Sequence, residues 1–330
     1  MNETVSKGSS PTARYLSIDA TRAGQRIDNF LITHLKGVPR THVYRILRKG
    51  EVRVNKGRIR PDYRLKTGDV VRVPPVRYTP ASEAGDLPPT DKALHRIREA
   101  VIHEDARLLV LNKPSGIAVH GGSGQRYGII EALRALRPEA PYLELVHRLD
   151  RETSGCLMIA KKRSMLRALH EALRRHRVDK RYLLLVAGQW QGQGRTVEME
   201  LRKNVLRSGE RVVHQDPEGK SSVTHFRPLA VGARASLLEA RIITGRTHQV
   251  RVHATSLGHP VAGDDKYGDR AFNREMHRLG LRRLFLHAAV LRFRLEETDK
   301  RLHVTSPLPE ELARVLDTVG LDYNFAKKNH

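Results

Sequence analysis

The chain has little cysteine, no long apolar run and few acidic residues, and each shortage excludes a class of protein. Cys156 is the only cysteine, so neither a disulfide framework nor a cysteine-based metal site can form. No apolar stretch is long enough to span a bilayer, and the polar N-terminus lacks the apolar core of a signal peptide. These absences predict a cytoplasmic protein that does not contact the membrane.

Basic residues far outnumber acidic ones. Lys and Arg together number 60 against 36 Asp and Glu, which gives a formal net charge of +24. In a chain with 39% hydrophobic residues, such an excess indicates a polyanionic partner, with nucleic acid favoured over an anionic membrane surface. The motifs of phosphate loops, dinucleotide folds, zinc proteases and esterases are missing. The sequence therefore predicts a nucleic-acid-binding protein that needs no metal and no other cofactor.

The length of 330 residues is enough for two domains. A stretch rich in proline and small residues, VPPVRYTPASEAGDLPPTDK, separates a small module from a larger one. The predicted division is a flexible tail over 1–14, a small domain over 15–78, a linker over 79–92 and a large domain over 93–330.

The small domain shows a simple helix and strand pattern. Ile27, Phe30, Leu31 and Leu35 form the apolar stripe of one helix, and THVYRILRKG predicts a second helix that ends at a glycine. EVRVNKGRI then predicts a short strand and a tight turn, and KTGDVVRVP predicts another strand.

The second helix and the turn after it carry basic residues of nearly one sign. Only Glu51 opposes them between Arg40 and Arg60. A solvated charged surface is the ordinary explanation of such a run, but the single sign favours one positive face that binds phosphates. The predicted RNA-binding residues are Arg40, Arg45, Arg48, Lys49, Arg53, Lys56 and Arg58.

The large domain is rich in strands. Strands are predicted within 107–116, 155–162, 181–188, 236–243, 283–295 and 301–308, and helices over 129–136, 164–176 and 245–258. Because strands are followed mostly by strands, the pattern favours an α+β fold on a mixed or largely antiparallel sheet with flanking helices.

Four polar clusters interrupt these apolar strands: HRLDRETSG, KRYLLLVAG, TGRTHQVRVH and GDDKYGD. Asp150, Tyr182 and Arg246 in the first three resemble the sequence motifs of the RluA-class RNA pseudouridine synthases, in the same order. LNKPSGIAVHGG and LFLHAA extend the likeness, which runs from about Val101 to Leu308. The small domain resembles the S4 RNA-binding domain over roughly Gln25 to Val73.

The resemblance implies a catalytic domain with a central cleft that isomerises uridine to pseudouridine without a cofactor. The implied substrate is large-subunit ribosomal RNA or its assembly intermediate, and the implied state is a monomer. Asp150 would act on the ribose as nucleophile or base, and Arg246 would be the cation that keeps this acid ionised. The Tyr182 ring would stack on uracil, with its hydroxyl near C5.

Four further residues are expected to bind the substrate or hold the site. Arg148 would fill the space that a flipped-out base leaves in the RNA. Val250 would form part of the apolar wall beside the base. His147 would tether the loop, and Arg151 would contact a phosphate or the loop.

Two other functions were compared with this one. A non-catalytic S4-type RNA-binding ribosome assembly factor would also suit the charge, but binding alone needs no buried acid. A glycosidase or nucleosidase usually places two carboxylates across the bond, and only Asp264 or Asp265 could supply the second. Taken singly, Asp150 could be a surface ion pair, Tyr182 a core aromatic and Arg246 a phosphate contact.

Overall fold

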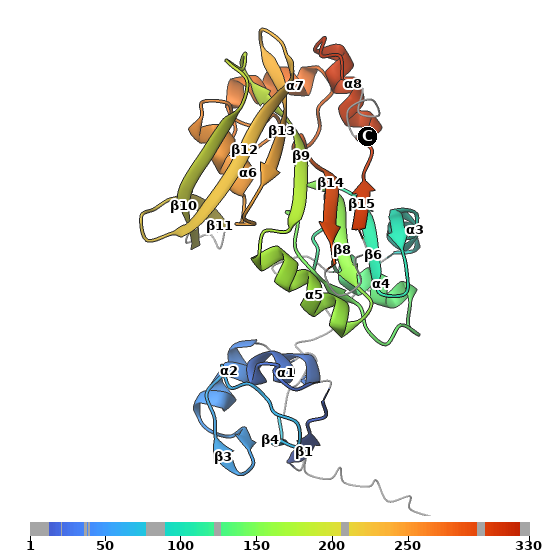
Figure 1. The fold of residues 1–330 in the computed structure, drawn as a ribbon, viewed down its shortest axis with the longest axis vertical. Coiled ribbons are helices and arrows are strands. Elements are labelled where there is room, and N and C mark those ends of the chain that lie inside the picture. Colours follow the sequence, from blue (N-terminus) through green and yellow to red (C-terminus); the bar gives the residue numbers. More distant parts are fainter. Residues whose placement is uncertain are drawn as a thin grey trace, which may run out of the picture. The chain divides into compact units, whose positions relative to one another are not determined.

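The computed structural model describes residues 13–20, 22–35, 38, 40–76, 90–121, 127–205, 211–295 and 301–323. The chain divides into two compact units, one within Met1–Asp86 and one within Leu87–His330, and Figure 1 shows the elements of each. Residues 1–12 of the predicted tail and 79–89 of the predicted linker lie outside the described residues.

The small unit packs two helices on a four-stranded sheet. The helices are α1 (Ile27–His34) and α2 (Arg40–Arg48). The sheet order is β1 (Arg14–Ser17), β4 (Val70–Val73), β2 (Arg53–Val54) and β3 (Gly57–Arg58). The predicted apolar stripe of the first helix is buried in the core between the helices and the sheet. Strand β1 was not predicted.

The tight turn predicted around Asn55 connects β2 and β3. Asn55 and Lys56 have φ angles of 50° and 68°, as a two-residue hairpin loop of type I′ requires. Helix α2 is followed by Gly50, whose φ of 70° matches the predicted helix stop.

The large unit is built on one mixed sheet, whose described part has 11 strands. Every pairing in it is antiparallel except that between β8 and β14. Its main path runs β11, β10, β12, β13, β9, β14, β8, β6, β5, while β15 pairs with β14 and β7 with β8. The bounds are β5 (Val101–Glu104), β6 (Leu108–Lys113), β7 (Glu144–Leu145), β8 (Ser154–Ala160), β9 (Val178–Ala187), β10 (Arg195–Val205), β11 (Arg211–Gln215), β12 (Lys220–Val231), β13 (Ala235–Ile242), β14 (Leu286–Arg294) and β15 (Arg301–Thr305).

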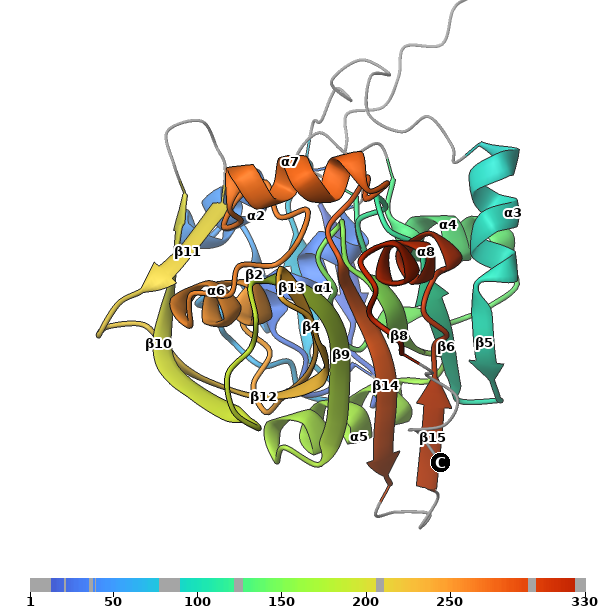
Figure 2. The ribbon, with the colours of Figure 1, turned by 90° about the horizontal axis from the view of Figure 1, so that it is seen from above.

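Helices cover both faces of this sheet, and Figure 2 shows them around the strands. Alternate residues of the strands decide which face each helix covers. Leu109 and Leu111 of β6 share one apolar cluster with α4 and α6, whereas Leu108 and Val110 share another with α5. The helices are α3 (Asp91–Glu99), α4 (Ile129–Leu136), α5 (Arg163–Arg174), α6 (Gln249–Ser256), α7 (Arg270–Arg278) and α8 (Glu310–Thr318).

The six predicted strands and three predicted helices of the large domain are all present. The predicted α+β class with a mixed sheet is confirmed. The strands β5, β7 and β10 to β12 and the helices α3, α7 and α8 were not predicted.

Gly155 lets the parallel strands β8 and β14 approach closely. It has a φ of 108°, and a Cβ placed on it would lie 2.2 Å from the carbonyl oxygen of Ala288. The pairing joins the strand after Asp150 to the centre of the sheet. Only glycine fits this position.

We expect Gly155→Ala to lower the free energy of unfolding by about 2–5 kcal/mol, the sum of backbone strain and overpacking. Urea unfolding can be followed through Trp190, which is the only tryptophan and is buried in the large unit. Gly258→Ala is the control, because Gly258 has a φ of 78° but no atom within 4 Å of the added Cβ. Equal losses in the two variants would contradict this account of Gly155.

Candidate active site

A cavity of about 540 Å³ opens beside the middle strands of the sheet in the large unit. Asp150 enters it from the loop between β7 and β8, and Tyr182 from β9. The third wall is the segment 244–251, which leads into α6. The cavity therefore brings together the three polar clusters on which the sequence analysis depended.

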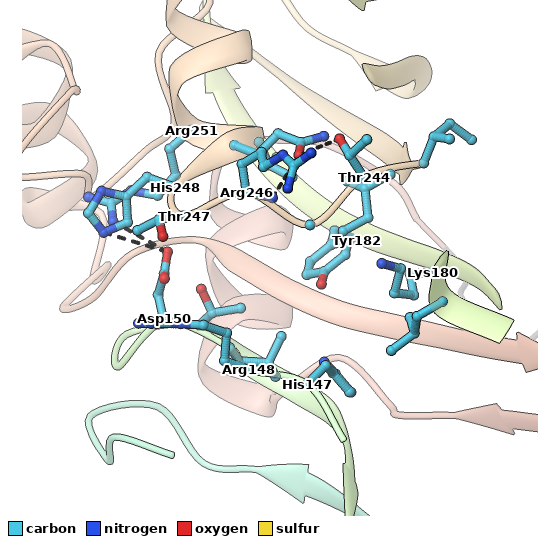
Figure 3. Close-up of a pocket in the computed structure, with 18 of the residues that line it drawn as sticks. His147, Arg148, Asp150, Lys180, Tyr182, Thr244, Arg246, Thr247, His248 and Arg251 are labelled. Carbon is cyan, nitrogen blue, oxygen red and sulfur yellow. Dashed lines mark hydrogen bonds and ion pairs between the residues drawn. The ribbon is translucent and has the colours of Figure 1, made fainter. Parts of the chain in front are cut away.

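Asp150 faces two cationic or potentially cationic side chains of this third wall (Figure 3). Its Oδ2 lies 3.7 Å from Nη1 of Arg251 and 3.9 Å from Nε2 of His248. Arg251 is 10% exposed and the Asp150 side chain 18%. The carboxylate of Asp150 therefore lies directly beside a buried guanidinium.

Arg251 is itself fixed by a second, fully buried carboxylate. Its Nε and Nη2 donate to the two oxygens of Asp264, each at 2.7 Å. Burial alone would raise the pKa of Asp264, but the bonds and charge of Arg251, with the N–H groups of Tyr267 and Lys266, hold it below its usual range. Burial alone would lower the pKa of Arg251, and the two carboxylates raise it.

His248 is held on the other side by Tyr267. The N–H of Val213 in β11 donates to the Tyr267 hydroxyl at 2.8 Å, so that hydroxyl is free to donate to His248 Nδ1 at 2.7 Å. Burial lowers the pKa of His248 to about 4. The imidazole is therefore neutral at neutral pH, with its remaining proton on Nε2, toward Asp150.

The structure gives Asp150 a different arginine from the one predicted. Arg246 is exposed, and its Nε donates to the carbonyl of Ser221 at 3.1 Å. Figure 3 shows it turned toward Thr244, away from Asp150. The helix begins at Gln249, so Arg246 stays in the preceding loop while Arg251 lies on the first turn, facing Asp150.

Gln249 fixes the loop that precedes α6. Its side-chain oxygen accepts from Thr244 Oγ1 at 2.7 Å and from the N–H of Arg246 at 3.0 Å. Its amide nitrogen donates to the carbonyl of Val223 and to Thr224 Oγ1, both at 3.0 Å. The side chain of Gln249 thus connects the loop to the neighbouring strand β12.

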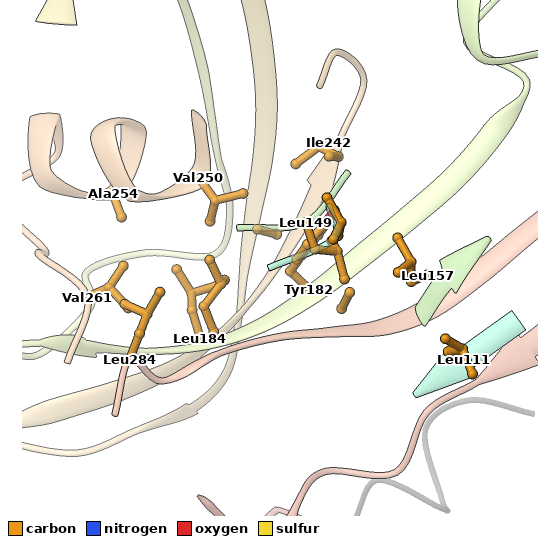
Figure 4. Packing of buried hydrophobic residues seen from close by; sticks show 14 of the residues in the cluster. Leu111, Leu149, Leu157, Tyr182, Leu184, Ile242, Val250, Ala254, Val261 and Leu284 are labelled. Carbon is orange, nitrogen blue, oxygen red and sulfur yellow. The ribbon is translucent and has the colours of Figure 1, made fainter. Parts of the chain in front are cut away.

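Tyr182 forms the apolar floor of the cavity together with Val250. Tyr182 is 7% exposed and Val250 5%, and both belong to the core cluster shown in Figure 4. Burial, followed by the charge of Asp150, raises the pKa of the Tyr182 phenol. Its hydroxyl therefore stays protonated at neutral pH.

The remaining predicted site residues lie on the loop of Asp150. His147 Nε2 accepts from the N–H of Met158 at 3.1 Å, in line with the predicted tether, and burial lowers its pKa to about 3. Arg148 is exposed at the edge of the cavity. Arg151 points elsewhere and pairs with Glu152 at 2.6 Å.

The predicted RNA-binding residues belong to the small unit. Six of the seven side chains are described, and all six are exposed: Arg45, Arg48, Lys49, Arg53, Lys56 and Arg58. The seventh residue, Arg40, begins α2, and its side chain is outside the described part.

Four residues that line or support the cavity were not predicted: Arg251, His248, Tyr267 and Lys180. All four lie inside the quoted clusters, so their position in a motif was the available signal. Asp264 was weighed as a second catalytic carboxylate, with a structured loop near the cleft preferred for its cluster, and it binds Arg251.

The described part of the chain contains neither a candidate metal cluster nor a membrane-spanning helix. No group of three or more His, Cys, Asp or Glu side chains in these ranges could hold a metal ion. No helix in them is long and apolar enough to cross a membrane.

Comparison with known proteins gives consistent matches for both units. Residues 107–256 match the family model for RNA pseudouridylate synthase, and residues 25–71 match that for the S4 domain. The ribosomal large subunit pseudouridine synthase C of Yersinia pestis is 54% identical over 310 residues, which cover 94% of this chain and 97% of that protein. Its counterpart in Escherichia coli K12 is 54% identical over 312 residues, which cover 94% and 98%.

Among solved structures, human RNA pseudouridylate synthase domain containing 4 is similar in fold. It matches with a TM-score of 0.58 and 26% sequence identity, over 70% of this chain and 96% of that one. The likeness to pseudouridine synthases and to the S4 domain inferred from the sequence is thereby confirmed.

We expect Asp264→Asn to lower the free energy of unfolding by about 3–5 kcal/mol, because it leaves the buried guanidinium of Arg251 with less compensating charge. Since the pKa of Asp264 is lowered in the folded state, its contribution is complete above its ordinary pKa of about 4 and is lost as the pH falls. The difference between wild type and variant should therefore shrink below about pH 4 in urea unfolding.

Glu218→Gln is the matched control for this variant. Glu218 is 80% exposed and pairs at 2.8 Å with Arg202, which is 52% exposed, so its loss should cost at most about 1 kcal/mol. An Asp264→Asn variant no less stable than Glu218→Gln would show that Arg251 does not need its buried partner.

Proposed function

This chain belongs to the RNA pseudouridylate synthase family, and from that premise we propose that it converts uridines of large-subunit ribosomal RNA into pseudouridine. The observation that carries the proposal is one carboxylate, Asp150, lying in a cavity between the buried Arg251 and the apolar face of Tyr182. Among the described residues that line this cavity, Asp150 is the only carboxylate. A hydrolase that places two acids across the bond is therefore disfavoured.

The reaction is an isomerisation in which all atoms of the nucleotide are kept. The bond between N1 of uracil and C1′ of ribose breaks, the base turns within the cavity, and C5 bonds to C1′. The proton on C5 is lost, and N1 ends with a proton. No electron is gained or lost, so the site needs an ionised acid and a surface on which the base can turn.

Asp150 supplies the ionised acid. Its carboxylate either attacks C1′ or removes a proton from the ribose, and both steps need a negative oxygen held in place. Arg251 provides the opposing positive charge, and neutral His248 directs its Nε2 proton toward the same oxygen. These two side chains keep the carboxylate oriented before RNA arrives.

Tyr182 supplies the surface for the base. Its ring lies in the apolar part of the cavity with Val250 and Leu286. The face of uracil can stack on this apolar surface, while the polar edge of the base stays free to form hydrogen bonds. Because burial raises the pKa of its phenol, Tyr182 meets the substrate as a neutral hydroxyl. A stacking role therefore has more support than removal of the C5 proton.

The uridine must leave the RNA stack to reach this cavity. Arg148, exposed at the cavity edge two residues before Asp150, is suited to fill the vacated space. Arg246, also exposed on the cavity wall, is proposed to contact the substrate. Arg151, paired with Glu152, is proposed to hold the loop.

The S4 domain is proposed to add affinity for structured RNA through its exposed basic residues. Its contacts would neutralise phosphates and carry no chemistry. A non-catalytic assembly factor would need the S4 domain alone, and relatives named as synthases over almost the whole chain favour the catalytic function. We propose that the protein acts as a monomer in the cytoplasm, where ribosomes are made, and without a cofactor.

We expect Asp150→Asn to fold and bind RNA but to lose at least about 1,000-fold in turnover, because the nucleophilic or basic oxygen is gone. The measurement is tritium release from C5-tritiated large-subunit ribosomal RNA. Asp150→Ala guards against deamidation of the asparagine, and Asp150→Glu tests placement, since it moves the charge by one methylene. Turnover by Asp150→Asn above a trace of the wild-type rate would refute the proposed mechanism.

The two arginines of the third cluster should differ in their kinetic effect. Arg251→Met removes the charge beside Asp150 and should lower kcat by about 100-fold or more. Arg246→Met should mainly raise KM, since Arg246 is exposed and distant from the acid. The comparison uses the same tritium assay, with Arg251→Lys as a variant that keeps the charge. A larger loss of kcat in Arg246→Met than in Arg251→Met would restore Arg246 as the partner of Asp150.

A further inference from the structure

Lys180 is a largely buried lysine of the active-site cavity, and no residue in the described part of the chain pairs with its ammonium group. It belongs to β9, lines the cavity and is 8% exposed. Figure 3 shows its nitrogen turned toward Tyr182, on the cavity side of the strand. Within the described ranges, no side chain or carbonyl forms a hydrogen bond or ion pair with this nitrogen.

Another lysine of the same unit shows how a buried ammonium is normally satisfied. Lys113 is 0% exposed, and its Nζ donates to the carbonyls of Pro114 at 2.9 Å, Ile117 at 2.8 Å and Arg151 at 3.0 Å. Buried charges in folded proteins are paired or hydrogen-bonded almost without exception. A lysine that lacks such partners inside a cavity is therefore suited to bind a ligand.

The titratable groups around Lys180 do not compensate its charge. His147 faces it from the loop before β8, Tyr182 from β9 itself, and Arg174 and His176 from the end of α5 and the turn after it. Burial, followed by the charge of Lys180, lowers the pKa of His147 to about 3, so this imidazole is neutral. Burial lowers the pKa of Lys180 itself to about 8.

The opposite wall does not compensate the charge either. Asp150, the only carboxylate in the lining, lies against Arg251 and His248. Arg246 adds another cation on that wall. The end of the cavity near Lys180 is thus positive.

Given the proposed function, we propose that Lys180 binds a phosphate of the RNA backbone beside the flipped uridine. A full negative charge compensates a buried ammonium better than a neutral carbonyl does. Lys180 precedes Tyr182 by two residues, so the two side chains share a face of β9, about 6–7 Å apart along the strand. With uracil stacked on Tyr182, Lys180 would lie beside the base, within reach of the RNA backbone.

Binding is measured in the Asp150→Ala background, where RNA is not turned over. Lys180→Met should weaken the binding of large-subunit ribosomal RNA by about 10-fold or more. The slope of log Kd against log salt concentration should fall by about 1, because one phosphate contact is lost. The control is Lys162→Met, which removes an exposed lysine before α5 and should change neither quantity.

The pH dependence separates a charged contact from a structural one. In the Asp150→Ala protein with Lys180, RNA affinity should fall above about pH 8, where the free lysine loses its proton. Lys180→Met should lack this decrease. Lys180→Arg should bind more tightly than Lys180→Met and lack it too, because a guanidinium stays charged throughout this range.

Stability should change in the opposite direction to affinity. Lys180→Met removes an uncompensated buried charge, so it should unfold at a higher urea concentration at pH 7. The gain should shrink between pH 8 and 10, because the unfolded lysine still holds its proton while the folded one has lost it. A lysine with a structural role would instead lose stability on this substitution.

Unchanged affinity and salt dependence in Lys180→Met would overturn the proposal. Weaker affinity with an unchanged salt dependence would also overturn it, and would assign Lys180 to a neutral carbonyl of uracil. Neither result bears on the proposed function, which depends on tritium release by the Asp150 variants.

Discussion

The buried pair of Arg251 and Asp264 is the interaction on which the site depends. A guanidinium with one-tenth of its surface exposed must have a carboxylate partner, and Asp264 binds it through two bonds of 2.7 Å. This geometry uses Nε and Nη2 and leaves Nη1 directed at Asp150, 3.7 Å away. Asp150, which we propose as the catalytic acid, therefore meets a cation whose position is already fixed, and substrate binding need not supply the energy to orient it.

Hydrogen bonds to backbone carbonyls also fix the loop that carries Asp150. The buried Nζ of Lys113 and the N–H of Gly116 both donate to the carbonyl of Arg151, next to Asp150. Ser115 Oγ donates to the carbonyl of Glu152 at 2.7 Å. The turn after β6 thus binds the peptide groups that follow Asp150. Chemistry at a ribose carbon needs sub-ångström placement, and backbone anchors of this kind supply it without entering the cavity.

Much of this arrangement follows from the sequence, and the exceptions have physical causes. Apolar periodicity predicted the helices on each face and the buried strands, because these residues form the core. Strand β10 does alternate buried apolar with exposed polar residues from Val197 to Leu201 and was overlooked, whereas the buried positions Ser222 and Thr224 of β12 are polar and give no apolar alternation. The choice of arginine failed for a conformational reason. His248 adopts a left-handed φ of 54°, which delays the helix to Gln249 and turns Arg251, not Arg246, toward the acid. One-dimensional spacing does not reveal such a backbone reversal.

Charge is distributed unevenly within the cavity, in a way that suits the nucleotide substrate proposed above. At one end the carboxylate of Asp150 already lies beside Arg251 and the neutral His248 before RNA arrives. At the other end no described residue pairs with Lys180, so its positive charge is compensated only when an anion enters. A flipped nucleotide brings an anionic backbone and a neutral base together, and these match the two ends and the tyrosine between them. A site with paired charges throughout would gain less from the same ligand, because each new contact would first have to displace an old one.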